Sequence, residues 1–175
     1  MKLKPQRDRE PARKGLRRGF TLIEILIVVV ILGILAALVF PKYAALDAEA
    51  RAKTAAANAR KVKELVQIHR HSGQYETNSY GNPTEIHAEW FRGGAIPEHS
   101  WTTQSFVINA VDAEGDLYPA VKTFDPEADG AANAWYNLSN GHFVVLIPEQ
   151  PTDEETLELF NIANSTEIVD LGATE

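Results

Sequence analysis

Glu24 has the clearest chemical implication in this sequence, because it is the only charged side chain in a long apolar run. Residues 20–40 read FTLIEILIVVVILGILAALVF, and only Thr21, Glu24 and Gly33 interrupt the apolar side chains. A carboxylate in a bilayer costs about 2.5–3.5 kcal/mol at the centre of a span and less near its end. Glu24 therefore requires a cationic partner.

Two kinds of cation could supply that partner. Within the chain, Arg17 and Arg18 lie on the adjoining turns before Glu24. If the chain were cut directly before Phe20, a new α-amino group with a pKa of about 7.7–8.0 would appear at the membrane surface. Glu24 of one copy could then neutralise the amine of another copy. Such a pair would stabilise assembly, since a half-made pair is costly in a low dielectric.

The apolar run has the length of a membrane span. As a helix, residues 20–40 would measure about 31 Å, and a bilayer core is about 30 Å thick. Residues 1–19 hold eight Lys or Arg and two acidic residues, a net charge of +6. Basic residues beside a span stay in the cytoplasm, so we expect the chain after Phe40 to lie on the other side. A secretory signal peptide cleaved after Ala37 is the alternative, although its apolar region is normally about 7–15 residues.

Composition narrows the function of the rest of the chain. The chain has 175 residues and a net charge of −7, so the part after the basic leader carries −13. An acidic domain argues against nucleic acid as a partner, because phosphate binding requires clustered Lys and Arg. The absence of Cys excludes disulfides, thiolate zinc sites and cysteine nucleophiles.

The segment after Pro41 predicts a continuation of the helix to about His71. It is rich in Ala, Lys, Arg and Glu, and Ser72 and Gly73 follow as a stop signal. Pro41 is expected to kink this helix rather than end it, since both flanks are strongly helical. Spacings of three and four place one set of mostly small side chains on a single stripe. They are Ala45, Ala48, Ala52, Ala55, Ala59, Val62, Val66 and His69. We expect this stripe to pack against a domain or neighbouring helices, with a coiled-coil seam as the alternative.

Residues 73–175 predict a small, strand-rich globular domain. A short helix is expected in EIHAEWF (85–91), and strands in SFVINAV (105–111), LYPAVKTF (117–124), AWYNL (134–138) and HFVVLI (142–147). Asn140-Gly141 is typical of a hairpin turn. Thr152 and Glu155 have capping-box spacing before a final helix. The predicted fold class is α+β, with a long N-terminal helix packed on a small antiparallel sheet.

The segment GFTLIEILIVVVILGILAALVFPKY (19–43) resembles the amino-terminal signature of type IV pilins and type II secretion pseudopilins. Members of that family are cut by prepilin peptidase and methylated on the new amino group. The resemblance makes Gly19 the residue before the cut, Phe20 the methylated residue and Glu24 the assembly glutamate. Gly33 and Pro41 match positions that weaken the helix. The implied domains are a leader (1–19), a long helix (20–72) with its transmembrane part at 20–40, and a globular domain (73–175).

The lack of Cys favours a pseudopilin within this family, since the major pseudopilins lack the pilin disulfide and often use calcium to hold their carboxy-terminal loop. Asp125, Glu127 and Asp129 form a possible calcium loop that resembles the first half of an EF-hand. Its twelfth position is Tyr136 rather than Glu, which excludes an EF-hand proper. Solvated acidic turns are the alternative. No other cofactor is expected.

No catalytic constellation emerges from the sequence, so we expect no enzyme. His69 and His71 point to different faces of a helix, and His87, His99 and His142 have no ligand spacing. No nucleophile, P-loop or dinucleotide motif is present.

The resemblance instead implies a filament subunit in the bacterial inner membrane, with a periplasmic domain. Its expected partners are further copies of the chain, minor pilins, membrane lipid, prepilin peptidase, a platform protein, an assembly ATPase and an outer-membrane secretin. A surface pilin for adhesion, motility or DNA uptake is the alternative within the family. A single-pass anchored binding domain is the alternative from another class.

Overall fold

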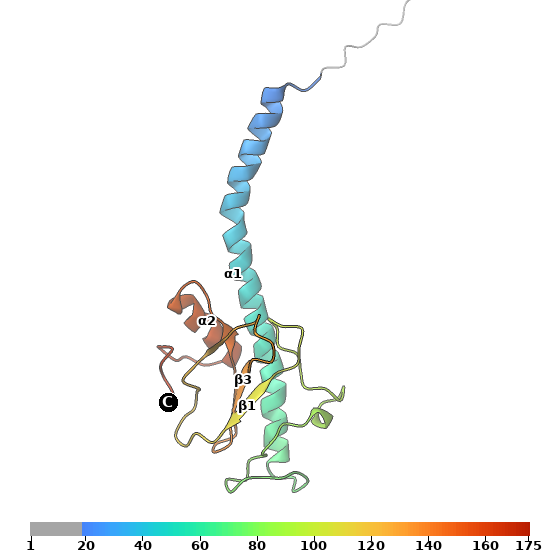
Figure 1. Ribbon diagram of the computed structural model, residues 1–175, viewed down its shortest axis with the longest axis vertical. Coiled ribbons are helices and arrows are strands. Elements are labelled where there is room, and N and C mark those ends of the chain that lie inside the picture. Colours follow the sequence, from blue (N-terminus) through green and yellow to red (C-terminus); the bar gives the residue numbers. More distant parts are fainter. Residues whose placement is uncertain (1–18) are drawn as a thin grey trace, which may run out of the picture. The chain divides into compact units, whose positions relative to one another are not determined.

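The computed structural model describes residues 19–175 and contains two α-helices, one short 3-10 helix and five strands (Figure 1). The chain divides into two compact units, Met1–Lys42 and Tyr43–Glu175. The order of elements is α1 (Leu22–His69), η1 (Ala88–Trp90), β1 (Ile108–Val111), β2 (Thr123–Phe124), β3 (Ala134–Asn137), β4 (His142–Val145), β5 (Ile147–Pro148) and α2 (Asp153–Asn164). The long N-terminal helix with a small sheet confirms the predicted α+β, pilin-like class.

Helix α1 is one continuous element of 48 residues that contains Pro41 in its interior. It ends at His69, two residues before the predicted end at His71. The expected stop signal follows at once: the Ser72 N–H donates to the His69 carbonyl (3.2 Å), and Gly73 has a φ of +65°. Positive φ at Gly73 turns the chain out of the helix, as glycine commonly does beyond a helix end.

The predicted small-residue stripe of α1 packs into the core of the second unit. Its central members are almost fully buried: Ala52, Ala55, Ala59, Val62 and Val66. They belong to the same hydrophobic cluster as Tyr136, Phe143 and Phe160, which come from the sheet and α2. This confirms packing against a domain as the role of the stripe. Only Ala45 departs from the expectation, because it is exposed.

The main sheet is mixed, which corrects the expected wholly antiparallel arrangement. Its strand order is β1-β3-β4, with β3 and β4 antiparallel and β1 parallel to β3. A second, two-stranded sheet pairs β2 and β5 in parallel. Parallel pairing arises because the 22-residue connection from Val111 to Ala134 crosses over rather than forming a hairpin. Asp129-Gly130 in that connection is a turn signal, but it does not join two adjacent strands, so the direction of β3 relative to β1 could not be read from it.

Glycine is required at the tip of the β3-β4 hairpin, where Asn140-Gly141 was expected to turn. Gly141 has a φ of +76°, and its N–H donates to the Asn137 carbonyl (2.7 Å). A Cβ at this position would lie 2.6 Å from Asn82 Oδ1. The buried Asn82 amide in turn donates to the carbonyls of Leu138 and Ser139 at 2.9 and 3.1 Å. The turn is therefore stabilised by the hydrogen bonds from Asn82 as well as by the backbone conformation of Gly141.

Polar side chains at both ends of α2 form hydrogen bonds with backbone groups. Asn164, at the end of α2, accepts from the Val145 N–H (2.8 Å) and donates to the Val145 carbonyl (2.9 Å), which closes the outer edge of β4. At the other end of α2, Thr152 Oγ1 accepts from the Glu155 N–H at 3.2 Å. This bond confirms the predicted helix cap.

Several predicted elements are shorter than expected. Strand β1 begins three residues after the start of the strand predicted over 105–111, and β3 ends one residue before the predicted end at 138. The helix predicted within 85–91 is only the single 3-10 turn η1, and the strand predicted over 117–124 is reduced to β2. Of the three Trp residues, Trp90 and Trp135 are buried and Trp101 is half-buried.

Candidate processing and assembly site

Three of the predicted site residues lie at the start of α1. Gly19 and Phe20 are exposed and precede the helix, which begins at Leu22. Glu24 lies in the first helical turn. The leader residues before Gly19, including Arg17 and Arg18, lie outside the described residues. An accessible, non-helical Gly19-Phe20 bond is what a peptidase requires of a substrate, because the chain must be extended to enter an active site.

Glu24 forms a capping box with Thr21 that sequence reasoning missed. The Thr21 N–H donates to Glu24 Oε2 at 2.7 Å, and the Thr21 hydroxyl donates to the same oxygen at 2.9 Å. The Glu24 N–H approaches Thr21 Oγ1 at 3.3 Å. The Thr-x-x-Glu spacing was a readable signal, because it is the sequence signature of a capping box. Glu24 therefore has a second role, in helix initiation, that any test of its charge must separate.

No side-chain packing among the described residues requires glycine at Gly19 or at Gly33. A Cβ built on either residue meets nothing within 4 Å, and neither residue has positive φ. Gly141 is the opposite case, since both its φ and its neighbours require glycine. Contacts within the described part of the chain therefore do not explain glycine at positions 19 and 33.

The apolar run of α1 is fully presented to its surroundings. The helix contains a stretch that is long and apolar enough to cross a membrane, and none of that stretch is buried. Leu22 is 93% exposed and Phe40 is 78% exposed. Large apolar side chains without a covering element are stable in lipid or in the core of an assembly, since water disfavours them.

The predicted calcium loop lies in an exposed turn after β2. Asp125 Oδ1 accepts from the Glu127 N–H at 2.9 Å, and Gly130 has a φ of +69°. Within residues 19–175, no group of three or more His, Asp or Glu side chains is arranged to hold a metal ion. Calcium binding by Asp125, Glu127 and Asp129 stays a prediction, which calorimetric titration with calcium would test.

His99 is a buried histidine with both ring nitrogens occupied. Its Nε2 lies 2.9 Å from the Leu146 carbonyl, to which it donates, and its Nδ1 lies 3.4 Å from the Trp101 N–H, from which it accepts. Burial lowers the pKa of His99 to about 4, against a smaller opposing effect of the Leu146 carbonyl. The imidazole is therefore neutral at pH 7 and serves the core rather than catalysis.

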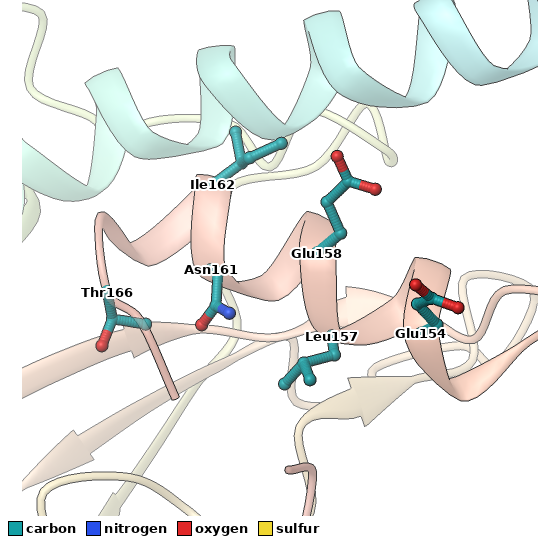
Figure 2. A pocket seen from close by; sticks show the side chains of 6 residues that line it. All are labelled: Glu154, Leu157, Glu158, Asn161, Ile162 and Thr166. Carbon is teal, nitrogen blue, oxygen red and sulfur yellow. The ribbon is translucent and has the colours of Figure 1, made fainter. Parts of the chain in front are cut away.

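The surface of α2 carries an open hollow of about 460 Å³ (Figure 2). It is lined by Glu154, Leu157, Glu158, Asn161, Ile162 and Thr166. Figure 2 shows Ile162 and Glu158 on the side of α2 that faces α1, and Leu157 on the opposite side. The lining combines apolar and acidic side chains and contains no nucleophile paired with a base.

Comparison with known families agrees with the geometry at the start of α1. Residues 15–40 match the family described as "Prokaryotic N-terminal methylation motif", which is the signature of type IV pilins and pseudopilins. No curated protein and no solved structure matches the chain. The motif marks a class of structural rather than enzymatic proteins. It supports a type IV pilin-like precursor, and it implies processing by a prepilin peptidase and assembly into a filament.

Proposed function

We propose that the chain is the precursor of a filament subunit, and that cleavage at Gly19-Phe20 frees an amino group that Glu24 of another copy neutralises. The observation that carries this proposal is a single carboxylate, Glu24, within the matched methylation motif and at the start of a helix whose apolar surface is uncovered. In a filament the exposed apolar side chains would be buried against one another, and their removal from water or lipid would favour assembly.

The orientation in the membrane follows from the charges. The basic leader would stay in the cytoplasm and the acidic domain would face the periplasm, because Lys and Arg beside a span resist translocation. Prepilin peptidase would then cut on the cytoplasmic side. A platform protein and an assembly ATPase would extract the processed subunit from the bilayer.

Within this class we propose a type II secretion pseudopilin, whose filament would work with an outer-membrane secretin. The support is the absence of Cys from the chain, since a disulfide-bounded loop is common in surface pilins. A deletion strain distinguishes the two uses. Loss of protein secretion with normal surface fibres supports the pseudopilin, and loss of surface fibres or motility with normal secretion supports the surface pilin.

The first experiment is the intact mass and amino-terminal sequence of the protein from native membranes. A chain that begins at N-methyl Phe20 supports the proposal. A chain that retains its leader contradicts it and indicates a membrane anchor, whereas a chain that begins after Ala37 indicates a secreted soluble domain.

The capping box of Thr21 and Glu24 provides a matched pair of variants for the assembly step. In Glu24→Gln, the amide oxygen can still accept from the Thr21 N–H, so the cap remains but the charge is lost. In Thr21→Ala, the hydroxyl is lost but the carboxylate remains. We expect both variants to be cleaved, Thr21→Ala to form filaments and Glu24→Gln to form none, as seen by electron microscopy. Filaments of normal abundance from Glu24→Gln would contradict the charge pairing. Equal loss in both variants would show that assembly also requires the capped start of α1, so that charge alone does not explain the role of Glu24.

A further inference from the structure

A buried cation, Lys122, lies in the globular unit and has no part in the proposed assembly step. Its side chain is only 2% exposed, although a free ammonium is strongly hydrated. Burying a charge without partners is costly, so this ammonium requires compensation inside the protein.

Three backbone carbonyls supply that compensation. Lys122 Nζ donates to the carbonyls of Pro119 (2.9 Å), Leu171 (2.8 Å) and Ala173 (2.6 Å). An ammonium has three N–H donors and no acceptor, so three carbonyl oxygens satisfy it completely. A neutral amine would have only two donors and would turn a lone pair towards a carbonyl oxygen.

The remaining surroundings of the ammonium also favour a positive charge. The Phe160 ring, which is fully buried, has its centroid 5.7 Å from Lys122 Nζ, within the range of a cation–π interaction. Burial lowers the pKa of Lys122 below its usual value, and the nearby Asp170 carboxylate opposes this shift by attracting the ammonium. Carbonyl oxygens, an aromatic face and a nearby carboxylate together make a site for a small cation.

Two of the three carbonyls belong to the segment after α2, residues 166–175, and the third belongs to the loop before β2. The same two stretches are joined by the Thr174 carbonyl, which accepts from the Leu117 N–H (2.7 Å) and the Tyr118 N–H (3.0 Å). The Lys122 carbonyl accepts from the Ile147 N–H (3.1 Å), which anchors the lysine backbone to β5. Lys122 therefore links β5 to a segment that forms no helix or strand of its own.

We propose that the carbonyls of Pro119, Leu171 and Ala173 form a cation-binding cage, that the Lys122 ammonium is its built-in occupant, and that this occupancy locks segment 166–175 onto the loop 117–122. The chain has no Cys, so no disulfide holds this segment. The lock also fixes the loop that presents Leu117 and Val121, which are 45% and 66% exposed. A small primary ammonium is the class of ligand that the emptied cage accepts.

The first test is Lys122→Met in the full chain, purified in detergent. Methionine keeps the unbranched apolar stem and removes the three donors. We expect the Leu117 and Tyr118 amides, which donate to Thr174, to exchange with deuterium about tenfold faster or more, because the segment opens locally. The Tyr136 amide in the main sheet serves as the internal reference. The matched control is Lys61→Met, an exposed lysine that bonds only Asn58. Unchanged exchange in Lys122→Met would overturn the lock.

The cage itself is tested by chemical rescue of Lys122→Ala. Propylammonium restores the three donors and most of the stem, and we expect it to return the exchange of the two amides towards the wild-type rate. Tetramethylammonium carries the same charge but has no N–H, so it should not restore protection. Equal rescue by both cations, or rescue by neither, would overturn the cation cage.

The wild-type chain provides a test that does not depend on the folding of a variant. In the ¹⁵N-labelled protein at neutral pH, Lys122 should give a slowly exchanging NH₃⁺ signal, while the Lys61 signal is lost to rapid exchange with water. A neutral amine at Lys122, or exchange as fast as at Lys61, would contradict the proposal.

Discussion

The two parts of α1 share one backbone conformation but have opposite relations to their surroundings. In residues 20–40 every side chain is exposed, including large aliphatic ones. From Ala52 to Val66, small and β-branched side chains on one stripe are buried completely. A helix in lipid or in a filament needs apolar surface on all sides, whereas a helix beside a sheet needs one narrow apolar face. The burial pattern therefore separates a part of the chain built for contacts with other molecules from a part built for contacts within the fold.

The largest expected effect comes from a charge placed on the buried stripe. Ala55 is fully buried and Ala57 is exposed, so the two alanines differ in burial within the same helix. Ala55→Asp should cost about 3–5 kcal/mol or prevent folding, because it buries an unpaired carboxylate. Ala57→Asp carries the same helix-propensity cost and should change stability by about 0.5 kcal/mol or less.

Chemical denaturation of the full chains in detergent, followed by tryptophan fluorescence, measures both variants. Similar losses in Ala55→Asp and Ala57→Asp would contradict the assignment of the stripe to the core.

The next effect is the pH dependence that His99 gives to the globular unit. The pKa of His99 is lowered from 6.5 to about 4 by burial, so between these values the unfolded chain binds more protons than the folded chain. Stability should be highest above about pH 6.5, fall as the pH decreases, and lose about 3 kcal/mol once the pH is below 4. Protonation would place a donor on Nδ1 against the Trp101 N–H.

Denaturant unfolding between pH 4 and pH 7 measures this slope. His99→Gln should flatten it, whereas His71→Asn should leave it unchanged because His71 is exposed. An equal slope in wild type and His99→Gln would show that other groups cause the acid sensitivity.

The glycines give a third contrast between the two regions. Gly141→Ala forces a positive φ on a side chain and places its Cβ against Asn82, so it should destabilise the globular unit by about 1–3 kcal/mol. Gly33→Ala meets no neighbour and should strengthen α1 by about 0.5–1 kcal/mol. In detergent, the midpoint temperature of thermal unfolding should therefore be lower for Gly141→Ala than for wild type, and it should not be lower for Gly33→Ala.

If filament formation needs a weakened helix, Gly33→Ala should assemble more slowly although its α1 is more stable. Normal assembly of Gly33→Ala would contradict a role of Gly33 in weakening the helix for assembly.

Most features that depend on interactions between residues close in sequence were predicted, and features that depend on distant residues were not. The membrane-length run, the stripe of α1, the Asn140-Gly141 turn and the Thr152 cap all depend on residues close in sequence, and each was predicted. The parallel pairing of β1 with β3 was not, because it depends on how residues 112–133 cross the sheet. Lys122 was also missed, since its acceptors Leu171 and Ala173 lie about 50 residues away and are backbone atoms, which have no sequence signature.

The candidate site also contains features that the sequence alone could not predict. Glu24 was singled out by its type and position, and Gly19 and Phe20 were predicted through the resemblance to pilins. The bond from Thr21 to Glu24 was local and readable but overlooked. The partner amine proposed for Glu24 belongs to another molecule, so neither the sequence nor the fold of one chain contains that contact. The buried amides Asn82 and Asn164 could not be anticipated, because only the packed fold shows which backbone groups lack a partner.

The smallest expected effect compares the two helix caps. Thr152→Ala removes the acceptor for the Glu155 N–H and should cost the globular unit about 1 kcal/mol. Thr21→Ala removes an equivalent hydroxyl from α1, but Thr21 contacts only Glu24 among the described side chains, so the denaturation midpoint of the globular unit should not move. If the denaturation curves of the two variants have equal slopes, the difference between their midpoints measures the difference in stability directly. A destabilised globular unit in Thr21→Ala would mean that the start of α1 is coupled to the fold. The start of α1 would then contribute to contacts within the chain, and it could not be assigned to contacts with other molecules alone.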